Sequence, residues 1–555
     1  MVVLKGIGVF KDISFGKILI VSPKEDGISK KTIDNSEQEV KRYKSAKEAA
    51  IKEIRNLYEK SLADCGAEEA EIFAAHEMMI KDDDYEATIL DIINNQKLNA
   101  EYAVWQASKK FSSIFEDMGD SYMAQRAADV KDISQRIINC LGSEKTSDES
   151  AYFPGESVVL FSTEFTPSEI SLIDRNRVKG FISSKGSVFS HASIISKVLK
   201  IPSVVGLEAD FKEEYNGEQV IINGFTGEVY IDPTPEVFAE FMQKKKENDT
   251  RAALLTKLKG KKNITKDGKT IKIYANINNP DEIDAAIEND AGGVGIFRSE
   301  FLYLNRKTHP TEDEQFEKYK EIVSKMENKQ VIIRTMDIGS DKKVDYFNLP
   351  EEKNPAMGYR GIRICLDRPE ILITQLRAIY RASVFGNVSV MFPMVVSVKE
   401  VLELKKIVEK VKNDLKDENI PFANNVKIGI MIETPAAVFI SDELAKEVDF
   451  FSIGTNDLTQ YSLAIDRQNG KVGDKFESHH PAILRMIKMV TDNAHKNGIE
   501  VGICGELAAD ENLTETFLAF GIDELSMTPS FILNVRKKVL EANVREIKDK
   551  ILANI

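Results

Sequence analysis

Eight short apolar runs recur through the second half of the chain, each followed by a longer helix-favouring stretch. They cover residues 272–277, 293–299, 331–337, 388–394, 427–434, 450–457, 501–506 and 524–527. Eight strand–helix units over about 250 residues match the number and length of a (β/α)8 barrel. The pattern therefore predicts a C-terminal TIM-type barrel over residues 263–555.

The front of the chain shows two other patterns. Residues 1–21 and 147–232 alternate short apolar runs with turn residues, which predicts one α/β domain. Residues 22–146 between them are rich in Glu, Lys, Ala, Ile and Leu, and no proline occurs between Pro23 and Pro154. This stretch is predicted to be an all-helical subdomain inserted into the α/β domain. The polar residues 233–262 predict a linker helix.

Composition narrows the class of protein. A hydrophobic fraction of 42% with 30% charged residues is that of a globular multidomain protein. The net charge of −14 argues against binding to nucleic acid, which needs a concentrated basic surface. The four cysteines are far apart without a CxxC pair, and no apolar run approaches the ~18 residues of a membrane span. A cytoplasmic protein without membrane insertion is expected.

Most of the apolar runs end in a residue that can do chemistry. These residues are Asn276, Arg298, Arg334, Asp337, Glu433, Asn456, Asp457, Cys504 and Glu506. Because the carboxyl ends of the strands form the active face of a (β/α)8 barrel, we expect their side chains to converge. A single strand-end Arg or Glu is more often a surface or ion-pair residue, whereas a whole set of them indicates a site.

The residue types in this set suit a phosphorylated acid. Arg298, Arg334 and Arg467 offer planar charged groups for phosphate or carboxylate. Glu433 and Asp457 are two oxygen ligands on neighbouring strand ends, which suits Mg²⁺ with substrate phosphate and water as further ligands. Cys504 is either a buried small apolar residue or a catalytic group, and its surroundings leave both interpretations open.

His191 is the candidate nucleophile of the front half. It follows Ser190, a plausible N-cap, at the start of the helical segment HASIISKVLK. The first turn of a helix attracts anions, and a neutral imidazole is nucleophilic near pH 7. A histidine at this position is more often a polar surface residue, so the local pattern alone leaves its role open.

Together these segments resemble Enzyme I of the phosphoenolpyruvate:sugar phosphotransferase system, over nearly the whole chain. In the barrel the resemblance rests on GIFRSEFLY, VIIRTMDIGSDK, NPAMGYRGIR, MFPMV, GIMIETPAA, FFSIGTNDLTQYSLAIDR and GICGELAAD. In the front half it rests on FTPSE at 165–169, the His191 segment, and AHEMMIKDDDYEATI at 75–89.

The resemblance implies a role for each candidate residue. His191 would be the phosphohistidine, and Cys504 would protonate the departing enolate. The substrate-binding residues would be Arg298, Arg334, Arg360, Asn456, Asp457 and Arg467. Glu433 and Asp457 would bind Mg²⁺. The inserted helices would dock the carrier protein HPr, the barrels would pair into a homodimer, and the front domain would swivel about the Pro235–Lys262 linker.

One segment departs from the family. At the phosphorylated histidine the family usually reads Gly-Gly-Arg-Thr-Ser-His-Thr, whereas this chain has GSVFSHA at 186–192. A hydroxyl and a positive charge are lost beside the nucleophile, which leaves a catalytically weak regulatory paralogue as the alternative function. Relatives such as pyruvate-phosphate dikinase would need a nucleotide-binding domain, for which the chain has no room.

Overall fold

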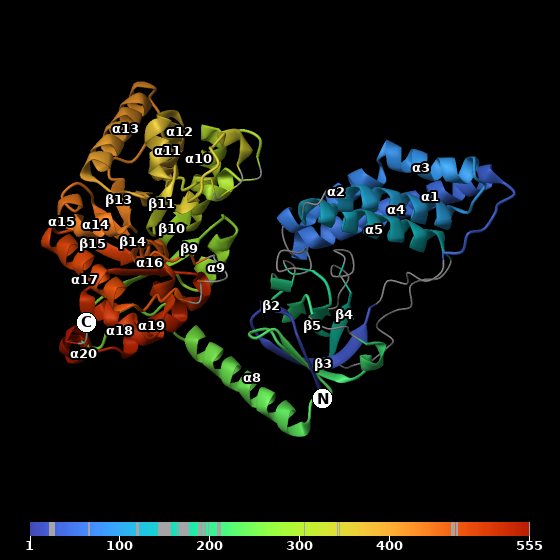
Figure 1. Ribbon diagram of the computed structural model, residues 1–555, viewed down its shortest axis with the longest axis horizontal. Coiled ribbons are helices and arrows are strands. Elements are labelled where there is room, and N and C mark those ends of the chain that lie inside the picture. Colours follow the sequence, from blue (N-terminus) through green and yellow to red (C-terminus); the bar gives the residue numbers. More distant parts are fainter. Residues whose placement is uncertain are drawn as a thin grey trace. The chain divides into compact units, whose positions relative to one another are not determined.

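The computed structural model describes residues 1–21, 28–64, 67–117, 121–142, 157–163, 165, 177–186, 193, 196–197, 199–207, 212–304, 306–340, 342, 344–467, 472 and 475–553. The chain divides into two compact units, Met1–Thr250 and Arg251–Ile555. Figure 1 shows the first with a group of helices and a sheet, and the second as a barrel wrapped by helices.

The described residues of the all-helical part of the first unit form five helices. They are α1 (Ser36–Asp64), α2 (Ala67–Ile80), α3 (Asp83–Asn94), α4 (Ala100–Asp117) and α5 (Ser121–Leu141). Their apolar faces share one core that contains Tyr43, Phe73 and Ile89. Asp82 caps α3, because its side chain accepts a hydrogen bond from the Tyr85 amide at 2.9 Å. The predicted helical insertion is confirmed as part of the fold class.

The residues just before α1 depart from the prediction of an all-helical insertion. Residues 28–35 are non-helical and lie against the start of α4. The Asn99 side chain accepts a hydrogen bond from the Lys31 amide at 2.9 Å. The Asn35 side chain accepts another from the Gln38 amide at 3.0 Å, which satisfies a free N–H group of α1. Asparagine side chains thus pair with main-chain groups here and compete with helix formation.

The α/β part of the first unit is one eight-stranded mixed sheet. Its strands are β1 (Val2–Lys5), β2 (Ile7–Phe10), β3 (Ile13–Ile20), β4 (Val158–Ser162), β5 (Val178–Ser183), β6 (Ser203–Val205), β7 (Gln219–Asn223) and β8 (Glu228–Ile231). They lie in the order β1-β8-β7-β3-β4-β5-β6-β2. Strand β3 pairs in parallel with β4, so the sheet joins segments that the helical region separates in sequence.

Helix α8 (Pro235–Thr256) follows the sheet and packs against it with its first half. Phe241 is buried in a cluster with Ile13 and Ile221. Lys245 forms an ion pair with Asp12 at 2.7 Å. Of the predicted linker 233–262, residues 235–256 are helical, and the first three turns of this helix belong to the α/β packing.

The second unit is a closed barrel of eight parallel strands, as predicted. The strands are β9 (Lys272–Ile277), β10 (Val294–Arg298), β11 (Val331–Arg334), β12 (Val388–Phe392), β13 (Lys427–Ile432), β14 (Phe450–Ile453), β15 (Glu500–Ile503) and β16 (Glu524–Met527). Strand β16 pairs with β9 to close the ring.

Helices follow the strands around the barrel. They are α9 (Glu282–Glu288), α10 (Glu312–Lys325), α11 (Ile362–Asp367), α12 (Pro369–Ala382), α13 (Val398–Asp417), α14 (Pro435–Phe439), α15 (Ser441–Leu444), α16 (Thr455–Leu463), α17 (Pro481–Lys496), α18 (Thr514–Phe520), α19 (Ile532–Glu541) and α20 (Val544–Leu552). Within the described part of the chain, no helix combines the length and apolarity needed to cross a bilayer.

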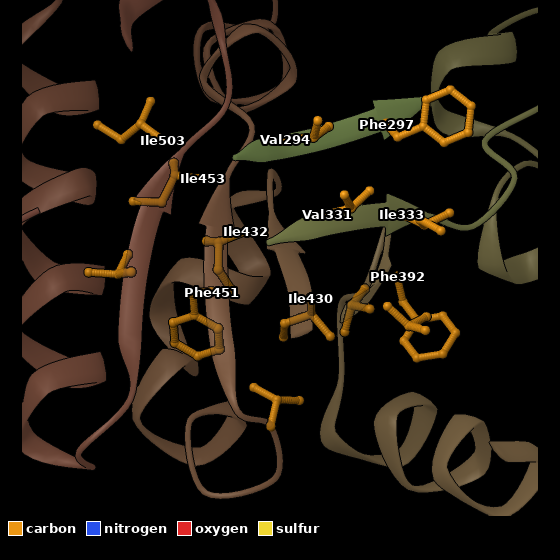
Figure 2. Packing of buried hydrophobic residues seen from close by; sticks show 14 of the residues in the cluster. Val294, Phe297, Val331, Ile333, Phe392, Ile430, Ile432, Phe451, Ile453 and Ile503 are labelled. Carbon is orange, nitrogen blue, oxygen red and sulfur yellow. The ribbon is translucent and has the colours of Figure 1, made fainter. Parts of the chain in front are cut away.

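Alternation along the barrel strands divides the buried side chains into two layers. One layer packs between strands and helices, and Figure 2 shows members such as Val331, Phe451 and Ile453. The other is a small cluster that comprises Ile296, Ile332, Met391, Met431, Phe450 and Cys504. Each buried Ile or Phe contributes roughly 1.5–3 kcal/mol relative to exposure, so these layers hold the strand ends in fixed positions.

Candidate active site

The carboxyl ends of the barrel strands carry the predicted site residues. Arg298 and Arg334 are the last residues of β10 and β11. Glu433 directly follows β13, and Cys504 directly follows β15. Asp457 lies in the first turn of α16, which follows β14. Because the parallel strands close into a ring, these residues lie on one rim, as the strand-end pattern predicts.

Arg334 is held by a buried acidic pair. Its Nη2 donates to Glu300 Oε1 at 2.9 Å, and its Nη1 lies 3.5 Å from Asp337 Oδ2. The same Glu300 oxygen accepts the Asp337 amide at 2.9 Å. Burial works to lower the pKa of Arg334, but Glu300, Asp337, Glu433 and Asp457 together raise it above its usual value. The guanidinium is therefore permanently charged and fixed in direction.

Asp337 links Arg334 to a second arginine. Arg360 donates from Nε to Asp337 Oδ1 at 3.1 Å and from Nη2 to Asp337 Oδ2 at 2.9 Å. Lys342 Nζ donates to the Asp337 main-chain carbonyl at 2.9 Å. Burial works to raise the pKa of Asp337, but the two arginines hold it down to about 2. The Asp337 carboxylate thus binds the Arg360 guanidinium through two hydrogen bonds and holds it next to Arg334.

Two arginines retain donors for an anion. The Nε groups of Arg298 and Arg334 are buried and have no hydrogen-bond partner among the described residues. Arg298 Nη1 donates to Asn278 Oδ1 at 3.2 Å, which orients the side chain. Buried unpaired N–H groups are costly unless a ligand accepts them, so this pair fits a bound phosphate or carboxylate.

Glu433 is the buried acid of the rim. Its Oε1 accepts the Met394 amide at 2.5 Å, while Oε2 has no hydrogen-bond partner among the described residues. Burial, followed by repulsion from Asp457 and Asp337, raises the pKa of Glu433 to about 8. A divalent cation beside Oε2 would relieve both the desolvation and the repulsion. The two carboxylates Glu433 and Asp457 therefore fit a metal that completes its shell with substrate and water.

In the described part of the chain, protein side chains alone do not form a complete metal site. Among the residues the structure describes, no three His, Cys, Asp or Glu side chains are grouped closely enough to hold a metal ion by themselves. Mg²⁺ is commonly bound through one or two carboxylates and keeps several other ligands. The donor set agrees with a metal that is bound together with a phosphorylated substrate.

Arg467 and Asn456 lie beside Asp457. Arg467 Nη2 is 4.0 Å from Asp457 Oδ1, and the arginine side chain is exposed. Asn456 and Glu506 bind each other: the amide donates to Glu506 Oε1 at 3.0 Å, and the Glu506 main-chain N–H donates back to Asn456 Oδ1 at 3.0 Å. Asn456 therefore connects α16 to the loop after β15.

Cys504 lies at the inner wall of the rim and is 3% exposed. Its thiol points toward the Ile453 carbonyl, with a distance of 3.7 Å from Sγ to O. Burial, with a further contribution from Glu433, raises the pKa of Cys504 to about 11. A Cβ on the next residue, Gly505, would lie 1.9 Å from Thr455 Oγ1, so the chain passes tightly here. The thiol is protonated at neutral pH and can act as an acid.

His191 and the preceding residues 187–190 lie outside the described residues. Sequence reasoning also passed over Glu300, which orders both Arg334 and Asp337. The sequence holds one local sign of Glu300: it lies two residues after Arg298 in a stretch that is buried, where an acidic residue is unusual.

Three family models match the chain. The model described as PEP-utilising enzyme, N-terminal, matches residues 5–126, and the mobile domain of PEP-utilising enzymes matches residues 153–227. The PEP-binding domain of these enzymes matches residues 252–544, which contain the barrel.

Curated relatives match the chain over nearly its whole length. A Staphylococcus carnosus protein named phosphoenolpyruvate-protein phosphotransferase is 39% identical to this chain, over 98% of this chain and 95% of that protein. The protein of this name in Bacillus subtilis is 39% identical over 99% and 97%. That of Listeria monocytogenes is 40% identical over 98% and 95%. The chain belongs to the phosphoenolpyruvate-protein phosphotransferase family of PEP-utilising enzymes.

Proposed function

We propose that the chain transfers the phosphoryl group of phosphoenolpyruvate to its own His191, releases pyruvate, and then passes the group to a histidine of the carrier protein HPr. The observation that carries this proposal is the convergence of fixed arginines, a raised-pKa glutamate and a buried thiol on one barrel rim. Full-length identity to phosphoenolpyruvate-protein phosphotransferases supports the same reaction.

The arginines bind and orient the substrate. Arg298 and Arg334, whose Nε groups have no partner among the described residues, would hold the phosphate together with Arg467, and Arg467 and Asn456 would lie near the carboxylate. Arg360, fixed by Asp337, adds positive charge on the substrate side. Fixed donors cost no reorganisation when charge develops on the phosphoryl oxygens, which favours the transition state.

Glu433 and Asp457 hold Mg²⁺ in this proposal. When bound, the metal withdraws charge from the phosphoryl oxygens and helps to orient the group. Glu433 supplies the buried oxygen Oε2, and Asp457 supplies the more exposed carboxylate. Met394 fixes the other Glu433 oxygen through its amide, so the carboxyl group keeps its direction.

Cys504 completes the reaction by protonating the enolate. In the transfer, a His191 ring nitrogen forms an N–P bond as the P–O bond to the C2 oxygen breaks, and the electron pair of the broken bond stays on that oxygen as the enolate, which becomes the C2 carbonyl when C3 is protonated. The enolate electron pair then forms a C3–H bond with the Cys504 proton, and the pair of the S–H bond remains on sulfur. A thiol with a pKa of about 11 is present in its acid form at neutral pH, as this step requires.

His191 belongs to the α/β domain and must reach both the barrel and the carrier. We propose residues 1–21 and 147–232 as that domain, residues 22–146 as the HPr-binding helices, residues 233–262 as the linker helix and residues 263–555 as the substrate-binding and dimerisation domain. The Phe241 cluster and the Lys245–Asp12 ion pair tie the first half of α8 to the sheet. A swivel of the front domain would therefore pivot beyond Lys245.

The docking surface, the cellular location and the oligomeric state are proposed from the family resemblance. The inserted helices α2 and α3 present the AHEMMIKDDDYEATI segment, with Met78 the most exposed of its large apolar side chains, as a docking surface for HPr. The protein acts in the cytoplasm as a homodimer through its barrels.

The test uses labelled phosphoenolpyruvate and Mg²⁺, with and without purified HPr. Wild-type protein should take up label, His191→Ala should not, and HPr should remove the label from the wild-type protein. No uptake by the wild type contradicts the proposal. Label that stays on the enzyme in the presence of HPr favours the regulatory paralogue that the GSVFSHA segment at 186–192 suggests.

A further inference from the structure

The main chain of Cys504 is bound from two sides. Its amide donates to the Ile453 carbonyl of β14 at 3.1 Å. Strand β15 pairs with β16 only at Gly502 and Ile503, so Cys504 lies one residue beyond that ladder. Its carbonyl instead accepts a hydrogen bond from Asn276 Nδ2 at 2.9 Å.

Asn276 reaches Cys504 across an intervening strand. It lies on β9, which pairs with β16 and not with β15. The same Nδ2 donates to the Ser526 carbonyl of β16 at 3.1 Å, and the Ser526 hydroxyl donates to Asn276 Oδ1. Because both ends of the amide have partners, its orientation is fixed.

We propose that Asn276 is a positioning residue that fixes the Cys504 main chain, so that the thiol meets C3 of the enolate from one side. This inference rests on the proposed function, in which Cys504 delivers the proton. Asn276 does not supply the proton, and its amide is engaged by main-chain carbonyls. The hydrogen bond from Asn276 replaces the β15–β16 main-chain bond that is missing at Cys504, and it closes the barrel beside the thiol.

The expected kinetic consequence is a fall in kcat. A displacement of a catalytic group by about 1 Å costs on the order of 100-fold in rate. Asn276→Ala should therefore lower kcat by about 10- to 100-fold and leave KM for phosphoenolpyruvate within about twofold, since the arginines are untouched. Asn276→Asp has the same shape but replaces the donor with a second acceptor, so it should lower kcat at least as much.

Asn497→Ala is the matched control. The Asn497 amide also donates to two main-chain carbonyls, those of Asn493 at 2.8 Å and Asp442 at 3.4 Å, at the end of α17. This control removes the same kind of contact from the barrel without touching the rim. It should leave kcat unchanged.

Two further measurements separate positioning from general stability. Alkylation of Cys504 by iodoacetamide without substrate, followed by peptide mass spectrometry, should accelerate in both Asn276 variants and not in Asn497→Ala. Pyruvate made from stereospecifically deuterated phosphoenolpyruvate in tritiated water should lose the facial selectivity of its methyl group in the Asn276 variants. Partial unfolding lowers the active fraction but leaves the facial selectivity of the remaining enzyme intact.

The outcomes are distinct. Wild-type kcat, facial selectivity and Cys504 alkylation in both Asn276 variants would overturn the positioning role. A raised KM with unchanged kcat would also overturn it and place Asn276 in substrate binding. If the wild type forms no pyruvate, the proposed function fails, while the alkylation rates still decide whether Asn276 anchors Cys504.

Discussion

Glu524 is a buried carboxyl group at the opposite end of the barrel strands from the candidate active site. It is the first residue of β16 and points into the barrel, where its Oε1 lies 2.4 Å from the position that a Cβ on Gly295 would take. Burial raises the pKa of Glu524 to about 8, with Lys272 opposing the shift. We predict that Glu524→Gln removes a large part of the pH dependence of barrel stability.

The sign follows from the two protonation states. The ordinary pKa of the carboxyl group is 4.5, so between pH 4.5 and about 8 the folded state keeps a proton that the unfolded state has lost. The free energy of unfolding therefore falls as pH rises through this window, by up to about 1.4 kcal/mol per pH unit. Over pH 5 to 8 the upper limit is about 4 kcal/mol, and relaxation of the barrel interior reduces it.

Calorimetry of the barrel transition at several pH values between 5 and 8.5 measures the effect. Glutamine resembles the protonated acid, so the variant should match the wild type near pH 5 and become the more stable of the two as pH rises. Glu515→Gln, an exposed glutamate at the start of α18, is the control and should differ from the wild type by a constant. A stability difference between Glu524→Gln and wild type that does not change with pH would refute the reasoning.

Further changes test the rim and the helical insertion. Glu300→Gln removes the charge beside buried Arg334 and should cost about 3 kcal/mol of stability and raise KM for phosphoenolpyruvate, measured by thermal unfolding and steady-state kinetics. Cys504→Ser should bind substrate normally but form pyruvate about 100-fold more slowly; an unchanged rate removes the thiol from the mechanism. Chelation with EDTA should abolish turnover, Mg²⁺ should restore it, and Glu433→Gln should need more Mg²⁺ for half-maximal rate. Asp82→Ala should destabilise the helical part by about 1 kcal/mol in denaturant titrations, since it removes the cap of α3.

The barrel was predictable because its strands are short, apolar and regularly spaced. All eight predicted runs contain an observed strand or overlap one, and β13 matches Lys427–Ile432 within the run 427–434. Parallel strands buried on both faces leave continuous apolar runs, which are visible without an alignment. The front sheet was harder to predict, because β3 pairs with β4 across the whole helical insertion.

The helical insertion shows where local pattern stops being sufficient. Residues 28–35 lie within the predicted helical insertion but are not helical, and the Lys31 amide pairs with the Asn99 side chain, 68 residues later. Local propensity is weak compared with such tertiary contacts. The cap at Asp82, by contrast, depends only on residues within the same turn and could be predicted.

In the candidate site, strand-end position indicated which residues share one rim of the barrel but not which partners they contact. The arginines and carboxylates lie at strand ends because the barrel topology collects those ends on one rim. The sharing of Asp337 by Arg334 and Arg360 depends on the path of the loop between β11 and α11. Local position draws attention to Glu300 and Asn276, but their partners Arg334 and Cys504 lie far away in sequence and are known only from the structure.

The amino-acid sequence by itself determined the multidomain α/β class, the barrel, the helical insertion and the residues available for phosphoryl chemistry, because these depend on periodicity and side-chain type. The tertiary structure alone decided which of those residues are charged, fixed or buried. Glu433 and Cys504 have raised pKa values because the closed barrel removes water and places acids nearby. The anchoring of Cys504 by Asn276 exists because the last strand pairs with the first and brings β9 close to β15.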